Sequence, residues 1–250
     1  MFSKITNDNV IKKLTEYAKS IDKQIYIVGG AVRDLILGES RITEIKDIDI
    51  ASTLSLKEVV DFAVLNNIDY VIKNNKLEVV SLSSGECCYE IARMRREIYA
   101  SKFTHNPTEV TFTVDVAEDA KRRDFTANSV YYATHNNSIV DPFCGVGDIE
   151  KKIVKTVLLP EQTLSVDPAR IIRMIELSAR FKFNIDEESF NIAKKYACNI
   201  NKLSKTRLKK ELERLYQTNK YSGESDGEYL NRVSLLVKDL GVSLEIRNKM

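Results

Sequence analysis

The fold is decided by two segments, IYIVGGAVRD at residues 25–34 and DID at residues 47–49. In the first segment an apolar strand ends at a glycine pair, and a short helix is expected to follow at once. Glycines at such a turn let backbone N–H groups approach an anion closely, and the start of a helix adds partial positive charge. Arg33, on the first turn of that helix, would add a further phosphate ligand. The segment therefore predicts a phosphate-binding turn.

Asp47 and Asp49 lie in a second apolar segment, residues 45–50. Side chains alternate along a strand, so both carboxylates should emerge on one face while Ile48 and Ile50 point to the core. Two neighbouring carboxylates repel each other unless a cation lies between them. Mg²⁺, which binds one or two carboxylates together with substrate phosphates, fits this arrangement. A phosphate-binding turn beside a metal-binding Asp-x-Asp indicates nucleotidyl transfer.

The composition is that of an ordinary soluble protein. The chain has 250 residues, 43% of them apolar, and 38 basic against 36 acidic residues, so the net charge of +2 does not by itself indicate a nucleic-acid partner. The apolar runs are far too short for a membrane span, and no signal peptide is evident at the N-terminus. The four cysteines have no metal-ligand spacing, which favours free thiols. We expect a cytoplasmic protein.

Periodicity predicts a mixed α/β region followed by an almost continuously helical one. The first region should be built on one twisted sheet. Its expected strands lie at 24–28, 45–51, 76–82 and 88–94, and its expected helices at 9–20 and 55–66. The helical region should contain helices at 161–183, 186–197, 202–218 and 228–240.

Several of these motifs together resemble one family. GGAVRD and DID match the pattern Gly-Gly-x-Val-Arg-Asp followed by Asp-x-Asp, and RRDFTAN at residues 122–128 matches Arg-Arg-Asp-Phe-Thr-x-Asn. The chain thus resembles the class II tRNA nucleotidyltransferases and bacterial poly(A) polymerases of the polymerase beta superfamily, over roughly residues 24–215. The resemblance implies an α/β head with a polymerase-beta-like mixed sheet at 1–150 and an all-α neck at 151–220 that reads the nucleobase. Residues 221–250 would begin a helical body.

The resemblance also implies roles for residues of the head. Asp47 and Asp49 would be catalytic and would hold two Mg²⁺ ions. Glu90, aligned with the family's Glu-x-x-x-x-Arg pattern, would be a third catalytic carboxylate that helps to deprotonate the RNA 3′-hydroxyl or completes the metal site. Residues 96–107 match the family's flexible loop, whose retention favours terminal A addition. The expected nucleotide-binding residues of the head are Gly29, Gly30, Arg33, Asp34, Arg123, Asp124 and Asn128.

In the neck, VDPARIIR at residues 166–173 resembles the family's Glu-Asp-x-x-Arg block. Asp167 would accept from the exocyclic amino group of cytosine or adenine, Arg170 would donate to the adjacent ring nitrogen, and Arg173 would reach the triphosphate. Two departures put nucleotide selectivity and rate in question. Val166 replaces the usual glutamate, and Glu176 stands where family members often have another arginine.

Two further blocks resemble the family less closely. DPFCGVGD at residues 141–148 matches Asp-Pro-x-Gly-Gly-x-x-Asp with a cysteine at the first glycine, and we interpret it as a structural turn. LSKTRLKKEL at 203–212 matches the family's neck helix with Thr206 in place of a glutamate. A basic stripe expected on one helical face could contact RNA phosphates. Its members are Lys202, Lys205 and Lys209, and Arg207 is a further expected RNA-binding residue.

The leading hypothesis is template-independent addition of C and A from CTP and ATP to the tRNA 3′ end, by a two-metal mechanism. A poly(A) polymerase or an A-adding enzyme is an alternative, although NNKLEVV at residues 74–80 is closer to the CCA-adding branch. Most of the body and tail that normally grip tRNA would be absent. A companion chain or homo-oligomer could then supply that grip, or the chain could be a truncated RNA-binding subunit that needs a partner.

Overall fold

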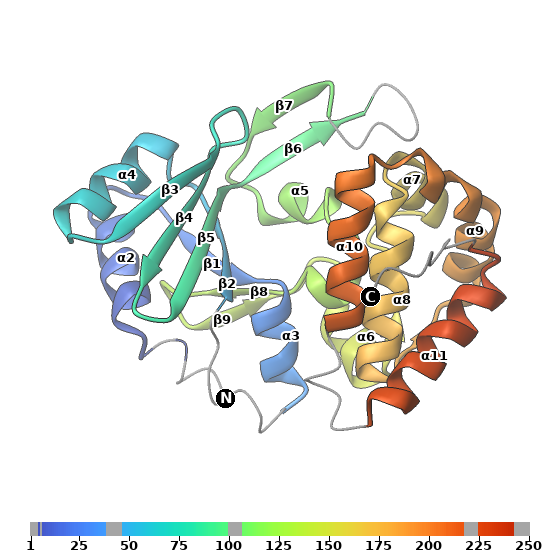
Figure 1. Cartoon of the computed structure of the whole chain (residues 1–250). Helices are drawn as coiled ribbons and strands as arrows, with labels where there is room; N and C mark the ends of the chain where they lie inside the picture. Colours follow the sequence, from blue (N-terminus) through green and yellow to red (C-terminus); the bar gives the residue numbers. More distant parts are fainter. Residues whose placement is uncertain (1–4, 6, 39–46, 100–106, 218–224, 243–250) are drawn as a thin grey trace. The chain divides into compact units, whose positions relative to one another are not determined.

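A computed structural model describes residues 5, 7–38, 47–99, 107–217 and 225–242 of the chain. The chain divides into two compact units. The first comprises residues 1–98 and 109–150, and the second comprises residues 99–108 and 151–250. Figure 1 shows the sheet of the first unit and the helices of the second.

The described residues of the first unit form a mixed sheet of seven strands in the order β3-β4-β5-β2-β1-β8-β9. β2 and β5 run parallel, and β1 pairs antiparallel with both β2 and β8. This confirms the predicted mixed α/β fold class. The strands are β1 (Ile25–Val28), β2 (Asp47–Ser52), β3 (Asp69–Asn74), β4 (Val79–Ser84), β5 (Cys87–Arg93), β8 (Tyr131–Ala133) and β9 (Ser138–Val140).

Two helices, α2 (Asn9–Ser20) and α4 (Leu56–Leu65), pack beside each other against this sheet. Their contact includes the rings of Tyr17 and Phe62, whose centroids are 5.5 Å apart. Each helix begins at a side-chain cap: Asp8 accepts from the Ile11 amide, and Ser55 forms a capping box with Glu58. The sequence predicted both helices within one residue at each end.

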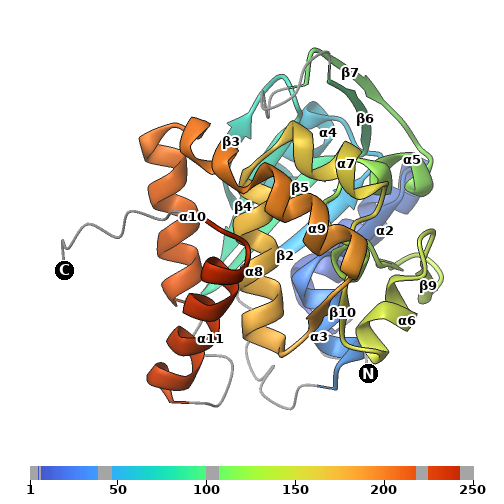
Figure 2. The same ribbon diagram turned by 90° about the vertical axis from the view of Figure 1, so that its right-hand side faces the viewer.

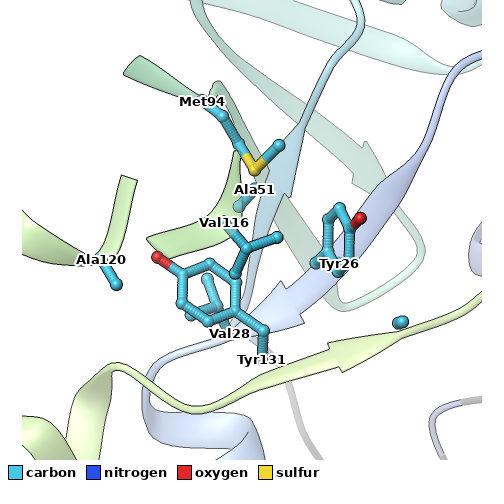
Figure 3. Close-up of a cluster of buried hydrophobic side chains, with 8 residues drawn as sticks. Tyr26, Val28, Ala51, Met94, Val116, Ala120 and Tyr131 are labelled. Atoms are coloured by element: carbon cyan, nitrogen blue, oxygen red, sulfur yellow. The ribbon is translucent and has the colours of Figure 1, made fainter. Parts of the chain in front are cut away.

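Part of the opposite sheet face is covered by a second apolar cluster (Figure 3). It lies under the short helix α5 (Val116–Lys121), which contacts a hairpin formed by β6 (Arg95–Ile98) and β7 (Glu109–Phe112). The cluster is built from Tyr26, Val28, Ala51, Met94, Val116, Ala120, Tyr131 and Ala133.

The 141–148 block forms the start of α6 (Gly145–Glu150). The Asp141 carboxylate accepts from the backbone N–H groups of Gly145 at 2.7 Å and Val146 at 2.9 Å. Cys144, at the position where the family pattern has a glycine, has φ +57°, a conformation that glycine adopts at no steric cost. At Gly145 a Cβ atom would lie 2.2 Å from the Thr126 carbonyl oxygen, so this position requires glycine.

Gly145→Ala should therefore destabilise the first unit, by at least about 2 kcal/mol, because the backbone of Thr126 must move. Gly147, in the same helix, has no atom within 4 Å of an added Cβ. Gly147→Ala is the matched control and should leave stability equal or raise it by up to about 1 kcal/mol. Urea denaturation of the two variants measures the difference. Equal stabilities would contradict the assigned packing of α6.

The second unit is helical, with one small exception. β10 (Ile153–Val154) and β11 (Asn184–Ile185) form a short parallel pair that the prediction of an all-α neck did not include. Figure 2 shows the helices of this unit from the side. They are α7 (Pro160–Val166), α8 (Ala169–Phe181), α9 (Glu187–Tyr196), the 3-10 helix η2 (Ala197–Lys202), α10 (Lys205–Gln217) and α11 (Asp226–Asp239).

Two predicted helices of this unit differ from the structure. The helix expected at 161–183 is broken in two, because the residue before a proline avoids the helical conformation, and Asp167 accordingly has φ −139° and ψ 101°. The helix expected at 202–218 begins at Lys205, and Lys202 belongs to η2. Lys202 therefore does not share one helical face with Lys205 and Lys209.

The described residues contain no helix that is both long enough and apolar enough to cross a membrane. The four cysteines are free, as the sequence predicted.

Candidate functional site

The glycine turn predicted from the sequence lies between β1 and α3 (Gly30–Ile36). Gly29 has φ +77° and ψ −140°, a conformation that residues with a side chain rarely adopt. A Cβ atom on Gly29 would lie 2.9 Å from Oδ2 of Asp49, because Val28 is paired with Asp49 in the adjacent strand. The backbone conformation thus requires glycine here, and a side chain would in addition displace the Asp49 carboxylate.

Three acidic side chains share one face of the sheet beside this turn. Along β2, Asp47 and Asp49 are exposed and Ile48 and Ile50 are buried, as strand alternation predicts. On the neighbouring parallel strand, exposed Glu90 is the register partner of Asp49. The structure therefore brings together all three carboxylates that the sequence analysis selected.

These residues suit a cation that shares its ligands with a substrate. No group of three His, Cys, Asp or Glu side chains among the described residues could hold a metal ion unaided. Mg²⁺ usually binds to one or two carboxylates plus substrate phosphates and water, and does not need a cage built wholly of protein. The hard oxygen donors of Asp47 and Asp49, exposed on one face, fit that requirement.

Arg33 connects the glycine turn to a distant motif. Its buried guanidinium contacts Oδ1 of Asp34, at 2.7 Å from Nη2 and 2.9 Å from Nε. Nη1 donates to Oδ1 of Asn128 at 2.6 Å, although 95 residues separate the two. Asn128 belongs to the 3-10 helix η1 (Thr126–Asn128). The GGAVRD and RRDFTAN motifs are thus joined by a charge-assisted hydrogen bond.

Asp124 and Asn128 lie at the two ends of the same short segment. Oδ1 of Asp124 accepts from the Phe125 amide at 2.8 Å and from Nδ2 of Asn128 at 3.5 Å. These contacts orient the Asp124 carboxylate at a half-buried position. Asn128 contacts both Arg33 and Asp124, which places these predicted site residues in one polar cluster.

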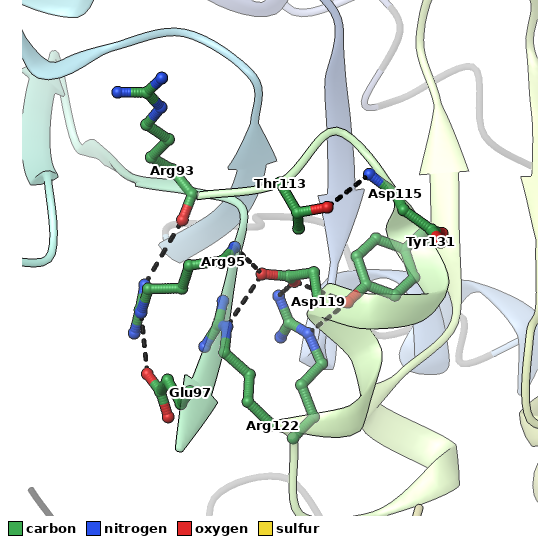
Figure 4. Close-up of polar contacts among 9 residues, drawn as sticks. Arg93, Arg95, Glu97, Thr113, Asp115, Asp119, Arg122 and Tyr131 are labelled. Carbon is green, nitrogen blue, oxygen red and sulfur yellow. Dashed lines mark hydrogen bonds and ion pairs between the residues drawn. The ribbon is translucent and has the colours of Figure 1, made fainter. Parts of the chain in front are cut away.

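A residue that the sequence analysis did not select, Asp119, organises the neighbouring polar network (Figure 4). Its carboxylate is fully buried. Oδ1 accepts from the Arg95 amide at 3.0 Å and from Nε of Arg122 at 2.8 Å. Oδ2 accepts from the Tyr131 hydroxyl at 2.8 Å and lies 3.4 Å from Nη2 of Arg123. The sequence did contain a signal for these ion pairs, because Asp119 precedes Arg122 and Arg123 by three and four residues, the spacing of ion pairs on a helix.

Arg123 is positioned through this network. Its Nε donates to the Tyr131 hydroxyl at 2.8 Å, and its guanidinium lies 5.1 Å from the centroid of the Tyr131 ring. Burial alone would lower the pKa of Arg123, but attraction to Tyr131, Asp119 and Asp49 raises it above its usual value. The side chain is thus a permanently charged cation held within electrostatic reach of Asp49.

The strand register places Asp49 on the same sheet face as Tyr131, to which Arg123 donates. Val28 pairs with Asp49 on one side and with Tyr131 on the other, so these three side chains share a sheet face. Tyr131 points its hydroxyl toward α5, where Asp119 lies (Figure 3). The apolar cluster therefore fixes the tyrosine ring whose hydroxyl holds Arg123 beside the acidic face.

In the second unit the predicted base-reading residues are held by α7 and α10. Oδ2 of Asp167 accepts from Nη2 of Arg207 at 2.6 Å, and Oδ1 accepts from the Ala169 amide at 3.1 Å. Arg170 is buried and donates from Nη1 to the Thr163 carbonyl oxygen at 3.2 Å. Arg207, predicted to contact RNA, therefore lies against a predicted nucleotide-binding residue of the same unit.

Two more ion pairs connect α8 and α10. Arg173 forms a bidentate contact with Glu211, at 2.9 Å from Nη2 and 3.2 Å from Nε. Glu176, which is buried, lies 2.9 Å from Nε of Arg214. Glu176 therefore does not leave an uncompensated buried charge where the family pattern has an arginine. We call Asp167–Arg207, Arg173–Glu211 and Glu176–Arg214 the α8–α10 ladder.

The other members of the predicted RNA-binding stripe are solvent-exposed. Lys202 lies in η2 and Lys205 is the first residue of α10. Lys209 is exposed on α10, with its Nζ 3.7 Å from the Glu213 carboxylate. Of the predicted flexible loop at 96–107, residues 100–106 lie outside the described part of the chain. RNA contact by the stripe stays a prediction.

The fold of the chain matches that of solved nucleotide-adding enzymes. The Bacillus stearothermophilus CCA-adding enzyme in complex with CTP has a TM-score of 0.76 at 24% identity, over 95% of this chain and 54% of that one. A CCA-adding enzyme in apo form II has a TM-score of 0.75 at 25% identity, over 94% and 54% of the two chains. The mixed sheet with its acidic face therefore has the polymerase-beta-like nucleotidyltransferase fold.

Sequence comparison then gives the family. The model of the poly A polymerase head domain matches residues 25–155, and the chain belongs to that family. CCA-adding enzymes of Leuconostoc mesenteroides and Lactococcus lactis are 33% and 32% identical to it over 192 and 208 residues. The matches cover 77% and 82% of this chain. They cover 45% and 48% of those enzymes, so the chain spans about half the length of the curated relatives that it matches.

Gly29→Ala should displace the Asp49 carboxylate and strain the turn. We expect the free energy of unfolding, measured by urea denaturation, to fall by about 2 kcal/mol. Gly85→Ala is the matched control, because Gly85 also has a positive φ, +61°, but no atom within 4 Å of an added Cβ. The control should therefore lose less stability than Gly29→Ala. Equal losses in both variants would contradict a role for the Gly29–Asp49 approach.

Asp119→Asn should destabilise the protein in a pH-dependent way. Burial would raise the pKa of Asp119, but Arg122, Arg123, the Arg95 amide and the Tyr131 hydroxyl lower it from 3.8 to about 2. Because the folded-state pKa is depressed, the carboxylate stabilises the fold above about pH 4, and this contribution is lost as the pH falls toward 2. At pH 7 we expect the variant to lose about 3 kcal/mol of unfolding free energy.

The difference in unfolding free energy between the unchanged protein and Asp119→Asn should shrink by about 2 kcal/mol as the pH falls from 4 to 2. Urea denaturation of the two proteins across this range measures it. Asp22→Asn, at an exposed carboxylate, is the control and should show no such trend. A difference between the unchanged protein and Asp119→Asn that stays constant with pH would contradict the charged state assigned to Asp119.

Proposed function

We propose that the chain transfers nucleotidyl groups from CTP and ATP to the 3′ end of tRNA without a template, in CCA addition or repair. One observation carries the proposal: exposed Asp47 and Asp49 lie on a sheet face beside a turn that requires glycine, and Arg123 is bound to Tyr131, whose side chain shares that face with Asp49. The names of the relatives support the same activity.

The residues of the first unit would have different roles in the reaction: metal binding, proton transfer and substrate binding. Asp47 and Asp49 would hold Mg²⁺, which when bound activates the attacking hydroxyl and offsets charge on the leaving pyrophosphate. Glu90, beside Asp49 on the same face, is suited to accept the proton of the 3′-hydroxyl. Arg123 supplies a fixed guanidinium fork for a phosphate or ribose oxygen, and Asp124 an acceptor for a ribose hydroxyl.

The residues of the second unit would select the base. Asp167 offers an acceptor whose direction is fixed by Arg207 and the Ala169 amide, and Arg170 offers donors anchored at Thr163. Cytosine and adenine each present an amino donor beside a ring-nitrogen acceptor, which this pair complements. A triphosphate that binds Arg173 would compete with Glu211 for the same guanidinium.

The assay uses purified protein, Mg²⁺ and tRNA transcripts that end at the discriminator base, at C and at CC. Each is incubated with CTP, ATP or both, and product lengths are read by mass. We expect growth to CCA followed by a stop. Extension by A alone would assign an A-adding or poly(A) enzyme instead, an alternative favoured by the family's description as a poly A polymerase head. No extension at all would overturn catalysis and favour an RNA-binding subunit.

Asp47→Asn and Asp49→Asn should each lower the rate of extension by about a thousandfold or more, because the ligands of the metal ions are lost. The affinity for tRNA, measured by filter binding, should change less than about twofold, since neutralising one exposed carboxylate weakens no RNA contact. Asp22→Asn is the control with the same chemical change elsewhere on the first unit. Full activity in either site variant would contradict the assignment.

A further inference from the structure

The outermost strand of the sheet leaves apolar side chains exposed. β3 pairs with β4 along one edge, and all six of its residues are exposed. Tyr70, Val71 and Ile72 keep 40%, 57% and 45% of their surface accessible. A strand edge of this kind is a template for pairing with another strand, and exposed apolar groups add a driving force for it.

The apolar face of the sheet continues onto this strand. Tyr70 and Ile72 are the register partners of Leu82 and Val80, which are fully buried core residues of β4. α4 contacts both strands, yet Leu65 at the end of α4 remains 74% exposed. Tyr70 and Ile72 thus extend the apolar face of β4 onto β3, where they stay partly exposed beside α4.

The ends of the strand carry opposite charges. Asp69 and Lys73 bracket the three apolar residues: Asp69 lies on the face opposite to Tyr70 and Ile72, and Lys73 lies at the bulge that follows Ile72. Within the described part of the chain, neither of the two forms an ion pair. The sequence Asp-Tyr-Val-Ile-Lys is therefore complementary to itself when it is reversed.

We propose that β3 docks against β3 of a second copy of this chain, antiparallel, with a two-fold axis at Val71. Each face of the joined sheets is then chemically matched. On one face Tyr70 lies opposite Ile72 of the second copy, an aromatic against a β-branched side chain. On the other face Asp69 lies opposite Lys73, and Val71 meets Val71. Pairs of these kinds stabilise antiparallel strands.

The charges select this arrangement over its alternatives. A parallel alignment in register would place Asp69 beside Asp69 and Lys73 beside Lys73, which is repulsive. The antiparallel arrangement is closed and isologous, as in most homodimers. A bulge at Lys73, between Ile72 and Asn74, ends the regular pairing, so the contact is short and the dimer should be weak and dependent on concentration. The proposal does not depend on the catalytic assignment.

Sedimentation velocity of the unchanged chain over a range of concentrations tests the proposal. We expect a monomer–dimer equilibrium. Asp69→Lys and Lys73→Asp should each weaken dimerisation by about tenfold or more, because two attractive pairs become repulsive. The double variant, Asp69→Lys with Lys73→Asp, should restore it. All these positions are exposed, so folding should be unaffected. A monomer at every concentration, or a double variant no better than the single ones, would overturn the proposal.

Crosslinking tests the register directly. Residues directly opposite each other on antiparallel strands are close enough for a disulfide, and Val71 should face itself across the two-fold axis. In a Cys144→Ser/Cys198→Ser background, which lacks the two exposed native thiols, Val71→Cys should give a covalent dimer under mild oxidation. Val114→Cys, at an exposed apolar residue outside β3, is the control. Equal crosslinking of both variants would overturn the assigned register.

Discussion

The buried carboxylate of Asp119 is the interaction on which the polar architecture of the first unit depends. A charge with no exposure to water is tolerated because two guanidinium groups, one amide and one hydroxyl satisfy it. These partners come from α5, from the beginning of β6 and from β8. One side chain thus connects the hairpin to the sheet and fixes the direction of Arg123. Arg123 is thereby held at Tyr131, whose side chain shares a sheet face with Asp49.

The sheet face that carries Asp47 and Asp49 could be predicted from local sequence patterns alone. A period of two places Asp47 and Asp49 together, and the glycine pair between a strand and a helix indicates a turn, because neither inference needs a distant contact. The approach of the Asp49 carboxylate to Gly29 was not visible in the sequence, since it arises from the pairing of two neighbouring strands. The pairing of Arg33 with Asn128 likewise depends on how α3 and η1 pack.

Other features escaped prediction for physical reasons. β3 is exposed on both faces, so it lacks the alternation of apolar and polar residues by which half-buried strands are recognised. Apolar periodicity continues across the break between α7 and α8 and therefore predicted one long helix, although Asp167 and Pro168 by themselves predict that a helix begins there. Arg207 was interpreted as a surface cation because the helix that carries it is rich in lysine. Its contact with Asp167 follows from tertiary packing alone.

The α8–α10 ladder has a consequence for how the second unit assembles. The signs alternate along both segments: negative at Asp167 just before α8, positive and negative at Arg173 and Glu176 on α8, and the reverse along α10. If α10 slid by one helical turn, Glu211 would meet Asp167 and Arg214 would meet Arg173. This slip would therefore bring like charges together at two of the three pairs, whereas apolar side chains alone would accept such a slip at little cost. The three ion pairs therefore favour one register of α10 against α8 over the registers shifted by one helical turn.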